Sequence, residues 1–343
     1  MIHATLRRIG GLRAASAFAG LTTVGVREGV LIEASDERGR VGFGEASPLE
    51  GFHATTTDEI SSRLDEITAL LETTEELSLE VIRDIASRSA APSVARFGLE
   101  TALLHLLAGG GGVVPSRVAG LFGEPLETVA IAGFGGPLLG ADAMGRARAL
   151  EARGIRTMKF KADGADLDAE RAALDAIRAG LDGDVAFRLD LNGALDPARA
   201  RRALAAYASH GVELVEEPCG GADLAGLDDT AMSWFADESL ADPEIASRML
   251  EHPCCAGFVI KPALHGFFGA RDLALRAIER GKQVVVTHMF DGPVALAAAC
   301  ELALSLPKAP LACGLDLHGG LDAYAPLVVP QHRGSVIRGV DHP

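Results

Sequence analysis

The sequence lacks the features that mark secreted, membrane-spanning and nucleic-acid-binding proteins. Its five cysteines are odd in number and none lie in a Cys-x-x-Cys spacing, so a disulfide framework and a zinc site are disfavoured and a reducing, cytoplasmic location is expected. No apolar run reaches the roughly 20 residues that a helix needs to cross a bilayer. The formal net charge of −15 disfavours nucleic acid and anionic membrane surfaces as partners.

A dinucleotide-binding loop is also absent, because no Gly-x-Gly-x-x-Gly follows any predicted strand. What is present is a chain of 343 residues, of which 48% are hydrophobic. That composition predicts a well-filled core and argues against disorder. The length is sufficient for one barrel and a smaller domain.

The first third of the sequence predicts an α+β capping domain over residues 1–125. Residues 26–33 and 41–45 have the pattern of two strands joined by a turn. Helices are predicted after the capping-box sequence at 56–59 and over residues 93–108. Strands followed by helices, without alternation, are typical of an α+β domain.

From residue 128 onward, strand and helix patterns alternate regularly. Eight strand segments with seven helical segments between them predict a modified TIM-type (β/α)7β barrel over residues 126–318. An open, doubly wound α/β sheet is the structural alternative. The tail over 319–343 lacks periodicity and is expected to return to the first domain. The predicted strands are 128–133, 155–161, 185–191, 212–217, 232–237, 256–261, 283–288 and 310–315, and the predicted helices are 141–153, 166–180, 196–210, 221–229, 242–251, 266–280 and 292–306.

Three carboxylates stand at the ends of neighbouring predicted strands. Asp190, Glu216 and Asp237 end the third, fourth and fifth barrel strands, and such ends meet at the rim where barrels place their chemistry. An all-oxygen set suits Mg²⁺ or Mn²⁺ better than Zn²⁺. A single acid at a strand end more often caps a helix or pairs with an arginine, but three in register favour a metal site. Neighbours in a strand face opposite ways, and spacing alone does not choose between Glu216 and Glu217.

Three lysines accompany these acids. Lys159 and Lys161 share one face of the second predicted strand, because two residues separate them, and Lys261 ends the sixth strand. Buried ammonium groups that lie near one another have lowered pKa values and can act as bases. The lysines can also simply neutralise the acids. A Schiff-base lysine is a further alternative, but it leaves the three carboxylates unexplained.

The motifs that hold these residues resemble the muconate-lactonizing subgroup of the enolase superfamily, over essentially the whole chain. They are Lys-x-Lys at 159–161, Asp190-Leu-Asn192, Glu216-Glu-Pro218, Asp237-Glu-Ser239 and Lys261-Pro262. Residues 44–52 are similar to the signature Gly-Glu-x-x-Pro-Leu-Pro-Gly-Phe of the o-succinylbenzoate synthase family, and depart from it at Glu50. Residues 92–97 and 314–316 are similar to the same family.

The resemblance implies a mechanism in which one Mg²⁺, held by the three acids, binds the carboxylate of a small-molecule substrate. Lys161 is then the base that removes the α-proton to form an enediolate, and Lys159 lowers the pKa of Lys161. Lys261 stabilises the anion from the opposite face. Asn192 is expected near the metal or the substrate carboxylate.

The implied reaction is the syn dehydration of 2-succinyl-6-hydroxy-2,4-cyclohexadiene-1-carboxylate to o-succinylbenzoate, on the route to menaquinone. An N-succinylamino acid racemase, in which Lys261 delivers a proton, is the first alternative, and a non-catalytic binding protein on the same fold is the second. Asp316-Leu-His318 stands where dipeptide epimerases of the subgroup have Asp-x-Asp, which counts against that activity. The sequence leaves the oligomeric state open.

Several further residues are expected near the substrate. His288 ends the seventh strand, without the aspartate on strand six that a His-Asp base requires, and Gly314 lies in the eighth strand. Asp291 is expected to cap the following helix rather than to take part in the chemistry. Residues 14–25, rich in small side chains, are predicted to form a lid over the barrel mouth, with a loop that makes no contacts as the alternative.

Overall fold

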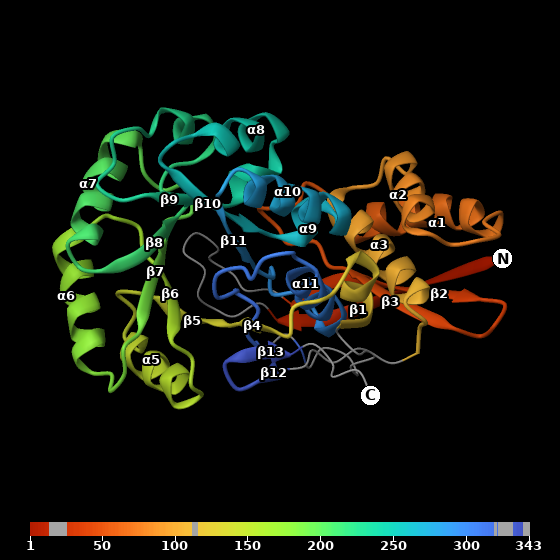
Figure 1. Ribbon diagram of the computed structural model, residues 1–343, viewed down its shortest axis with the longest axis horizontal. Helices are drawn as coiled ribbons and strands as arrows, with labels where there is room; N and C mark the ends of the chain where they lie inside the picture. The colour runs from red at the N-terminus through yellow and green to blue at the C-terminus, as the bar shows by residue number, and fades with distance from the viewer. Residues whose placement is uncertain (14–25, 112–115, 319–320, 322–331, 339–343) are drawn as a thin grey trace.

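A computed structural model describes residues 1–13, 26–111, 116–318, 321 and 332–338. In Figure 1, a curled parallel sheet with outer helices lies on the left, and an antiparallel sheet with its own helices lies on the right. The predicted lid over 14–25 and most of the tail over 319–343 lie outside the described residues, so both expectations stay predictions. In the described part, no helix combines the length and apolar character needed to cross a membrane.

The first unit pairs an antiparallel sheet with helices packed on it. Its strands, in the order β1-β2-β3, are β1 (Ile2–Arg13), β2 (Val26–Asp36) and β3 (Val41–Ala46). Its helices are α1 (Thr57–Glu72), α2 (Leu79–Arg88) and α3 (Ser93–Leu107). The capping box predicted for α1 is present between Thr56 and Glu59, whereas α2 was not predicted. Helix α3 lies so close to β3 that a Cβ on Gly44 would come within 1.8 Å of the Gly98 carbonyl oxygen.

The second unit is the predicted barrel. Seven parallel strands follow in the order β11-β10-β9-β8-β7-β6-β5. Parallel bridges from Ile131 to Cys313 and from Thr287 to Gly314 join its two edges through an eighth strand segment, which closes the barrel and excludes an open sheet. The strands are β5 (Ala132–Pro137), β6 (Thr157–Lys161), β7 (Ala186–Asp190), β8 (Val212–Glu216), β9 (Trp234–Ala236), β10 (Cys255–Ile260) and β11 (Gln283–Val286).

Helices alternate with these strands nearly as predicted. They are α5 (Ala143–Ala152), α6 (Leu167–Ala179), α7 (Pro197–Ala208), α8 (Pro243–Glu251), α10 (Phe267–Glu279) and α11 (Pro293–Leu304), with short helices α4 (Ser116–Ala119) and α9 (Pro262–His265). The helix predicted over 221–229 is wrong in type, because that segment forms a 3-10 turn, η2 (Gly221–Gly226).

The first predicted barrel strand is divided in two. Its first part, β4 (Thr128–Ala130), leaves the barrel to pair with β13 (Val336–Arg338), which in turn pairs with β12 (His332–Arg333). Only β5 joins the barrel sheet. The described end of the tail therefore lies beside the start of the barrel.

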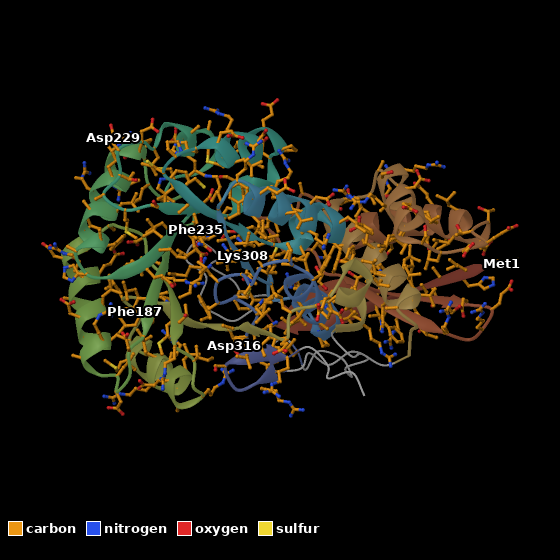
Figure 2. All side chains as sticks on the ribbon, in the orientation of Figure 1. Met1, Phe187, Asp229, Phe235, Lys308 and Asp316 are labelled. Atoms are coloured by element: carbon orange, nitrogen blue, oxygen red, sulfur yellow. The ribbon has the colours of Figure 1, made fainter. Side chains whose placement is uncertain are left out.

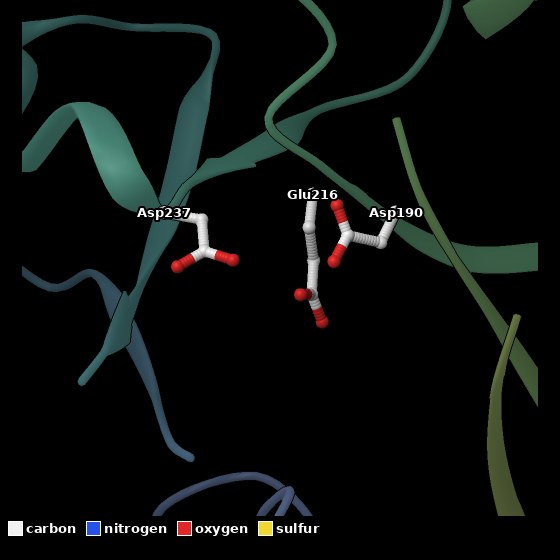
Figure 3. Close-up of side chains that lie close together, drawn as sticks. All are labelled: Asp190, Glu216 and Asp237. Atoms are coloured by element: carbon white, nitrogen blue, oxygen red, sulfur yellow. The ribbon is translucent and has the colours of Figure 1, made fainter. Parts of the chain in front are cut away.

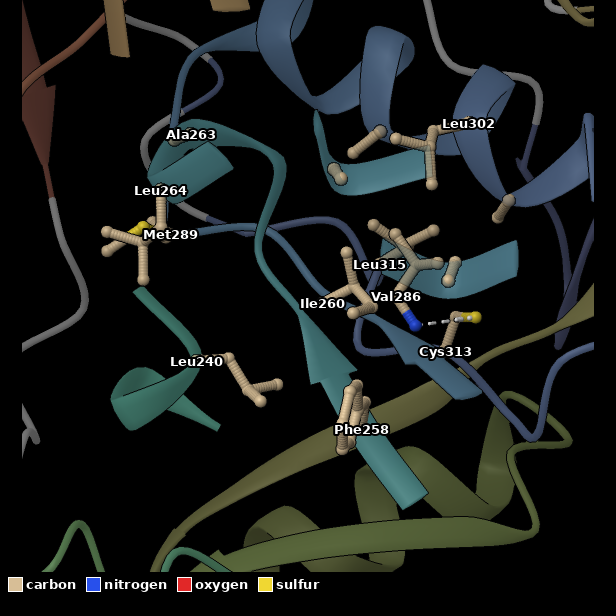
Figure 4. Close-up of a cluster of buried hydrophobic side chains, with 14 of the residues drawn as sticks. Leu240, Phe258, Ile260, Ala263, Leu264, Val286, Met289, Leu302, Cys313 and Leu315 are labelled. Atoms are coloured by element: carbon tan, nitrogen blue, oxygen red, sulfur yellow. Dashed lines mark hydrogen bonds between the residues drawn. The ribbon is translucent and has the colours of Figure 1, made fainter. Parts of the chain in front are cut away.

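Alternation along the strands separates the barrel interior from its outer layer. Phe235 and Val259 point inward into a small apolar cluster that also holds Leu214 and Val285. Their neighbours Phe258, Ile260 and Val286 point outward against the helices, as Figure 4 shows. There the Val286 amide donates to Sγ of Cys313, at 3.3 Å, and ties β11 to the eighth strand segment. Figure 2 labels Phe187 on β7 and Phe235 on β9, two strands apart in the sheet.

Buried glutamates of the first unit bind helix N-termini of the barrel. The Glu45 carboxylate accepts the amides of Gly292, at 2.6 Å, and Ala295, at 3.2 Å, at the start of α11. The Glu100 carboxylate accepts the amides of Phe267 and Phe268 at the start of α10. Since a helix N-terminus presents unpaired N–H groups and a partial positive charge, these contacts fix the first unit, the cap, on the barrel.

We expect Glu100 to make stability depend on pH. Burial raises the pKa of Glu100 to about 7 from its ordinary 4.5, although the amides of Phe268 and Phe267 oppose the shift. The native state therefore favours the protonated form of Glu100, and this preference adds on the order of 3 kcal/mol to the free energy of unfolding. The added stability is complete below about pH 4.5 and is lost as pH rises through about 7. Urea denaturation of Glu100→Gln should show a flatter stability profile between pH 5 and 8 than the wild type. An unchanged slope would contradict the assignment.

Candidate active site

The carboxyl ends of the barrel strands bring the predicted acids and lysines to one place. Lys161 pairs in register with Asp190, and Asp190 pairs with Glu216, across three neighbouring strands. Asp237 follows β9 directly and Lys261 follows β10 directly. Lys161, Asp190, Glu216 and Lys261 line one pocket, together with residues of the cap and of the later barrel loops.

Three carboxylates converge beside this pocket, and two of them, Asp190 and Glu216, line it. Asp190, Glu216 and Asp237 each place an oxygen within 4.8 Å of the others, and each is about 1% exposed (Figure 3). Among the described residues, Oδ2 of Asp237 is buried without a hydrogen-bond partner. Buried carboxylate oxygens that lack a donor and share a centre fit a hard divalent cation such as Mg²⁺. The residues present therefore fit the metal that the sequence predicted.

The structure distinguishes Glu216 from Glu217. Glu216 belongs to the acid cluster, whereas the Glu217 backbone turns to a φ of +43° and its side chain leaves the barrel centre. The Glu217 carboxylate accepts the Asp237 amide at 2.6 Å and the Ser239 amide at 3.2 Å. Burial, and then the nearby charge of Glu238, raise the pKa of Glu217 to about 8. Glu217 thus fixes the loop after β9, which positions Asp237.

Asp237 and Glu238 form the next pair of neighbouring acids. Glu238 does not face away from Asp237, because β9 ends at Ala236 and the 3-10 helix η3 (Glu238–Ala241) begins immediately after Asp237. The Glu238 carboxylate accepts the side-chain amide of Asn192 at 3.0 Å and lies 3.3 Å from the Lys261 ammonium. A fourth acid therefore borders the site.

Each of the three lysines contacts an acid of the cluster. The Lys159 ammonium lies 2.8 Å from Oδ2 of Asp190 and also contacts Glu216. The Lys161 ammonium lies 2.6 Å from the same oxygen of Asp190. The Lys261 ammonium lies 2.5 Å from Oδ1 of Asp237. The lysines approach from β6 and β10, on opposite sides of the barrel centre.

The lysines have different pKa shifts. Burial lowers the pKa of Lys161, and the charges of Lys159 and Lys261 act in the same direction, against the opposing charge of Asp190. Burial also lowers the pKa of Lys159, but the charges of Asp190, Glu216 and Asp237 together raise it well above its ordinary range. For Lys261 the effect of burial is likewise exceeded by Asp237 and Glu238, and its pKa is raised. Lys161 is thus the lysine most easily obtained as a neutral amine.

Asn192 bridges the two sides of the site. Its backbone has a φ of +45°, and its amide donates to Oδ1 of Asp190 at 3.0 Å. Its side-chain oxygen accepts from Lys161, while its side-chain nitrogen donates to Glu238. The predicted proximity of Asn192 to the acid cluster is therefore present in the structure, whereas contact with a substrate stays a prediction.

An apolar wall lies opposite the acids. Phe134 and Phe290 meet edge to face at 5.9 Å, and His288 stacks on His318 at 4.6 Å beside Phe290. Burial lowers the pKa of each histidine to about 3, so both are neutral. The predicted His288 and Gly314 line the pocket, together with Leu49, Phe52, Phe134, Arg188, Met289, Phe290 and Asp316.

Some of these residues were missed in the sequence. Arg188 stands two residues before Asp190, so strand alternation already placed it on the inner face. It is 1% exposed, and its guanidinium donates to the Ala312 carbonyl at 2.6 Å and to Glu213 at 2.5 Å. Phe134 and Phe290 gave no signal, because a lone aromatic residue near a strand end does not differ from a core residue.

Two acids near the wall are held by arginines. Asp316, which stands at the first position of the Asp-x-Asp motif while His318 replaces the second aspartate, forms a two-pronged ion pair with Arg153, with one contact at 2.9 Å. Asp291 accepts the Met289 amide at 2.9 Å and pairs with Arg27 of the cap at 3.3 Å. Asp291 therefore has a structural role, but it does not cap α11 as predicted, because the amides at the start of that helix donate to Glu45.

Fold and site together define a class of protein. Its members have a (β/α)7β barrel with an α+β cap, and the ends of the barrel strands carry an acid cluster flanked by lysines. Residues 142–337 match the family model described as enolase C-terminal domain-like. The chain belongs to this family and thus to the enolase superfamily, whose related proteins include enzymes of several activities.

Individual relatives show how far the comparison extends. The chain is 29% identical over 283 residues to an o-succinylbenzoate synthase of Thermosynechococcus vestitus, with 80% of each chain covered. It is 28% identical over 322 residues to an L-Ala-D/L-Glu epimerase of Bacillus subtilis, covering 89% of this chain and 87% of the relative. A muconate lactonizing enzyme from Pseudomonas fluorescens has the same fold, with a TM-score of 0.81 at 22% identity over 100% of this chain and 94% of that one. Relatives with different reactions are thus about equally similar.

Proposed function

We propose that this protein is an o-succinylbenzoate synthase, which removes water from 2-succinyl-6-hydroxy-2,4-cyclohexadiene-1-carboxylate on the route to menaquinone. The observation that carries the proposal is a buried lysine of lowered pKa, Lys161, beside an acid cluster that can hold a divalent cation. A synthase stands among the relatives beside an epimerase of about equal similarity, so the choice between their reactions rests on the residues of the pocket.

Lys161 is the base in this proposal. Its neutral amine takes the proton α to the substrate carboxylate, and the Lys261 ammonium stabilises the anion that develops on the opposite side. Bound Mg²⁺, held by Asp190, Glu216 and Asp237, would supply Lewis-acid stabilisation of the substrate carboxylate. The Lys161 ammonium then returns its proton to the leaving hydroxyl group on the same face. One C–H and one C–O bond break, a C=C bond forms, and water leaves.

The pocket wall supports a substrate with a ring and without an ammonium group. Phe134, Phe290 and the neutral His288 offer apolar surface. The Asp316 carboxylate is already paired with Arg153, so it is not available to an ammonium group of a dipeptide. We infer from this that dipeptide epimerisation is disfavoured.

Racemisation of an N-succinylamino acid is the second candidate. The observation that favours it is the placement of Lys161 and Lys261 on opposite sides of one acid cluster, which permits proton transfer at both faces of an α-carbon. The two reactions share proton abstraction and differ in whether a leaving group is present. A purely binding function is disfavoured because the acid cluster and the three lysines are all in place.

The test is an absorbance assay with the cyclohexadiene substrate and Mg²⁺, run with and without a chelator. We expect rapid loss of substrate with formation of o-succinylbenzoate, and complete loss of activity after chelation, recovered when Mg²⁺ or Mn²⁺ is added back. No turnover with Mg²⁺ present would refute the synthase. Deuterium exchange into both enantiomers of N-succinyl amino acids would then test the racemase.

A further inference from the structure

Lys261 differs from the other two lysines in how it is held. Lys159 and Lys161 lie within β6, where the neighbouring strands fix the backbone through the register of the sheet. Lys261 lies one residue beyond the end of β10, and the pairing of β10 with β11 stops at Ile260 and Val286. The position of the Lys261 backbone therefore depends on the segment that follows it.

That segment is short and has a sharp bend. Lys261 is the residue before α9, and its carbonyl accepts the Leu264 amide at 2.9 Å. After α9, Gly266 takes a φ of +78° and α10 begins at Phe267. A helix of four residues has little stability of its own, so external contacts must hold it.

The cap supplies these contacts at two points. Nδ1 of His53 accepts the Leu49 amide, so Nε2 carries the proton and donates to the Ala263 carbonyl in α9 at 3.1 Å. Glu100, only 4% exposed, accepts the amides of Phe267 and Phe268 just after the bend. The cap thus holds both the middle and the end of the segment after Lys261.

Packing at the bend is tight. A Cβ on Gly266 would come within 2.9 Å of Oε2 of Glu100, so the backbone bend and the carboxylate fit directly against each other. Phe52, from the same cap loop as His53, places its ring centroid 5.3 Å from the Lys261 ammonium. The contacts made by the cap therefore extend from Glu100 to the ammonium group itself.

We propose that Glu100 is a positioning residue, which anchors the segment after Lys261 to the cap and so couples the docking of the cap to the position of the Lys261 ammonium. The proposal rests on the proposed function only in that Lys261 acts on the substrate. The cap is then part of the machinery that sets the second lysine, in addition to forming a wall of the pocket.

The chain offers a matched control in Glu301. This glutamate is also 4% exposed, and it also accepts a backbone amide, that of Ala119, at 2.8 Å. It lies on α11 and binds α4, and although it lines the same small pocket as Phe267, its carboxylate accepts the Ala119 amide and not the amides after Gly266. Removing it tests the loss of a buried glutamate that provides no acceptor to that segment.

The test compares Glu100→Ala, Glu100→Gln and Glu301→Ala in the full chain. In Glu100→Ala we expect amide hydrogen exchange over residues 262–270 to become about tenfold faster, since two amides lose their acceptor. Acetylation of Lys261 by an amine-reactive ester, read by mass spectrometry, should change by a similar factor. Dehydration turnover should fall by about 10- to 100-fold, with Mg²⁺ affinity unchanged. Glu100→Gln should restore all three to within about threefold, because the amide oxygen still accepts.

Each outcome decides between the alternatives. Unchanged exchange and Lys261 acetylation in Glu100→Ala, or equal changes in Glu301→Ala, would overturn the proposal. Faster exchange with unaltered Lys261 acetylation and unaltered turnover would show that Glu100 holds the segment without positioning the lysine, and would also overturn it. If the wild type has no dehydratase activity, the proposed function fails, and exchange and acetylation still decide the role of Glu100.

Discussion

Lys161→Ala is expected to lower the turnover number by about 10⁴-fold, the upper end of what a positioned base contributes. The reason is that Lys161 is the buried lysine whose pKa is lowered, whereas the pKa values of Lys159 and Lys261 are raised. The fold should persist, because Asp190 keeps its ion pair with Lys159 and its hydrogen bond from the Asn192 amide. Turnover assays and solvent deuterium exchange at the α-carbon measure the loss of the base, and far-UV circular dichroism measures whether the fold persists.

Two control variants separate base chemistry from charge. Lys161→Arg keeps a cation but cannot supply a neutral amine near pH 7, so it should lose as much turnover as Lys161→Ala. Lys308→Ala removes an exposed lysine and should leave turnover unchanged (Figure 2). Full activity in Lys161→Ala would remove this residue from the mechanism.

Asp237→Asn is expected to weaken Mg²⁺ binding by at least about 100-fold and to abolish chelator-sensitive activity. The substitution replaces a buried anionic oxygen by a neutral amide at a position where Oδ2 has no other partner among the described residues. Hard divalent cations depend on the charge of such ligands. Isothermal titration with Mg²⁺ measures the affinity directly, without substrate.

The matched control is Asp223→Asn. Asp223 is an exposed carboxylate on η2, outside the acid cluster, and its removal should leave the titration unchanged. In Asp237→Asn the Lys261 ammonium retains Glu238 at 3.3 Å, so a loss of affinity is not expected to come from unfolding. An Mg²⁺ titration equal to that of the wild type would contradict the assignment of Asp237 as a ligand.

Hydrophobic periodicity was sufficient to predict most of the barrel. Strand β6 ends at Lys161, as predicted, and α6 spans Leu167–Ala179, within one residue of the predicted limits at both ends. The reason is physical: strands buried on both faces are continuous apolar runs, and helices that cover them keep one apolar face. Alternation of the two signals fits either a barrel or an open doubly wound sheet, and the bridges to the eighth strand segment decide between them.

The predictions of secondary structure failed where tertiary packing, rather than the local sequence pattern, decides which element forms. Helix α2 spans Leu79–Arg88 and places Ile82 and Ile85 in the core, but a helix this short gains most of its stability from tertiary contacts. The segment after β8 forms only the turn η2 (Gly221–Gly226), where glycines at both ends weaken a helix. The division of the first barrel strand into β4 and β5 depends on pairing with β13, more than 200 residues later, which no local pattern indicates.

The sequence by itself determined the chemistry of the site: three carboxylates and three lysines at the ends of successive parallel strands, whose types and spacing follow from local pattern alone. Tertiary structure decided which of them meet. Glu216 rather than Glu217 joins the cluster because the Glu217 backbone leaves the strand conformation, and Glu238 borders it because β9 ends early. Glu100 binds the segment after Lys261 although more than 160 residues separate Glu100 from Phe267 in the sequence. Only folding brings such groups together.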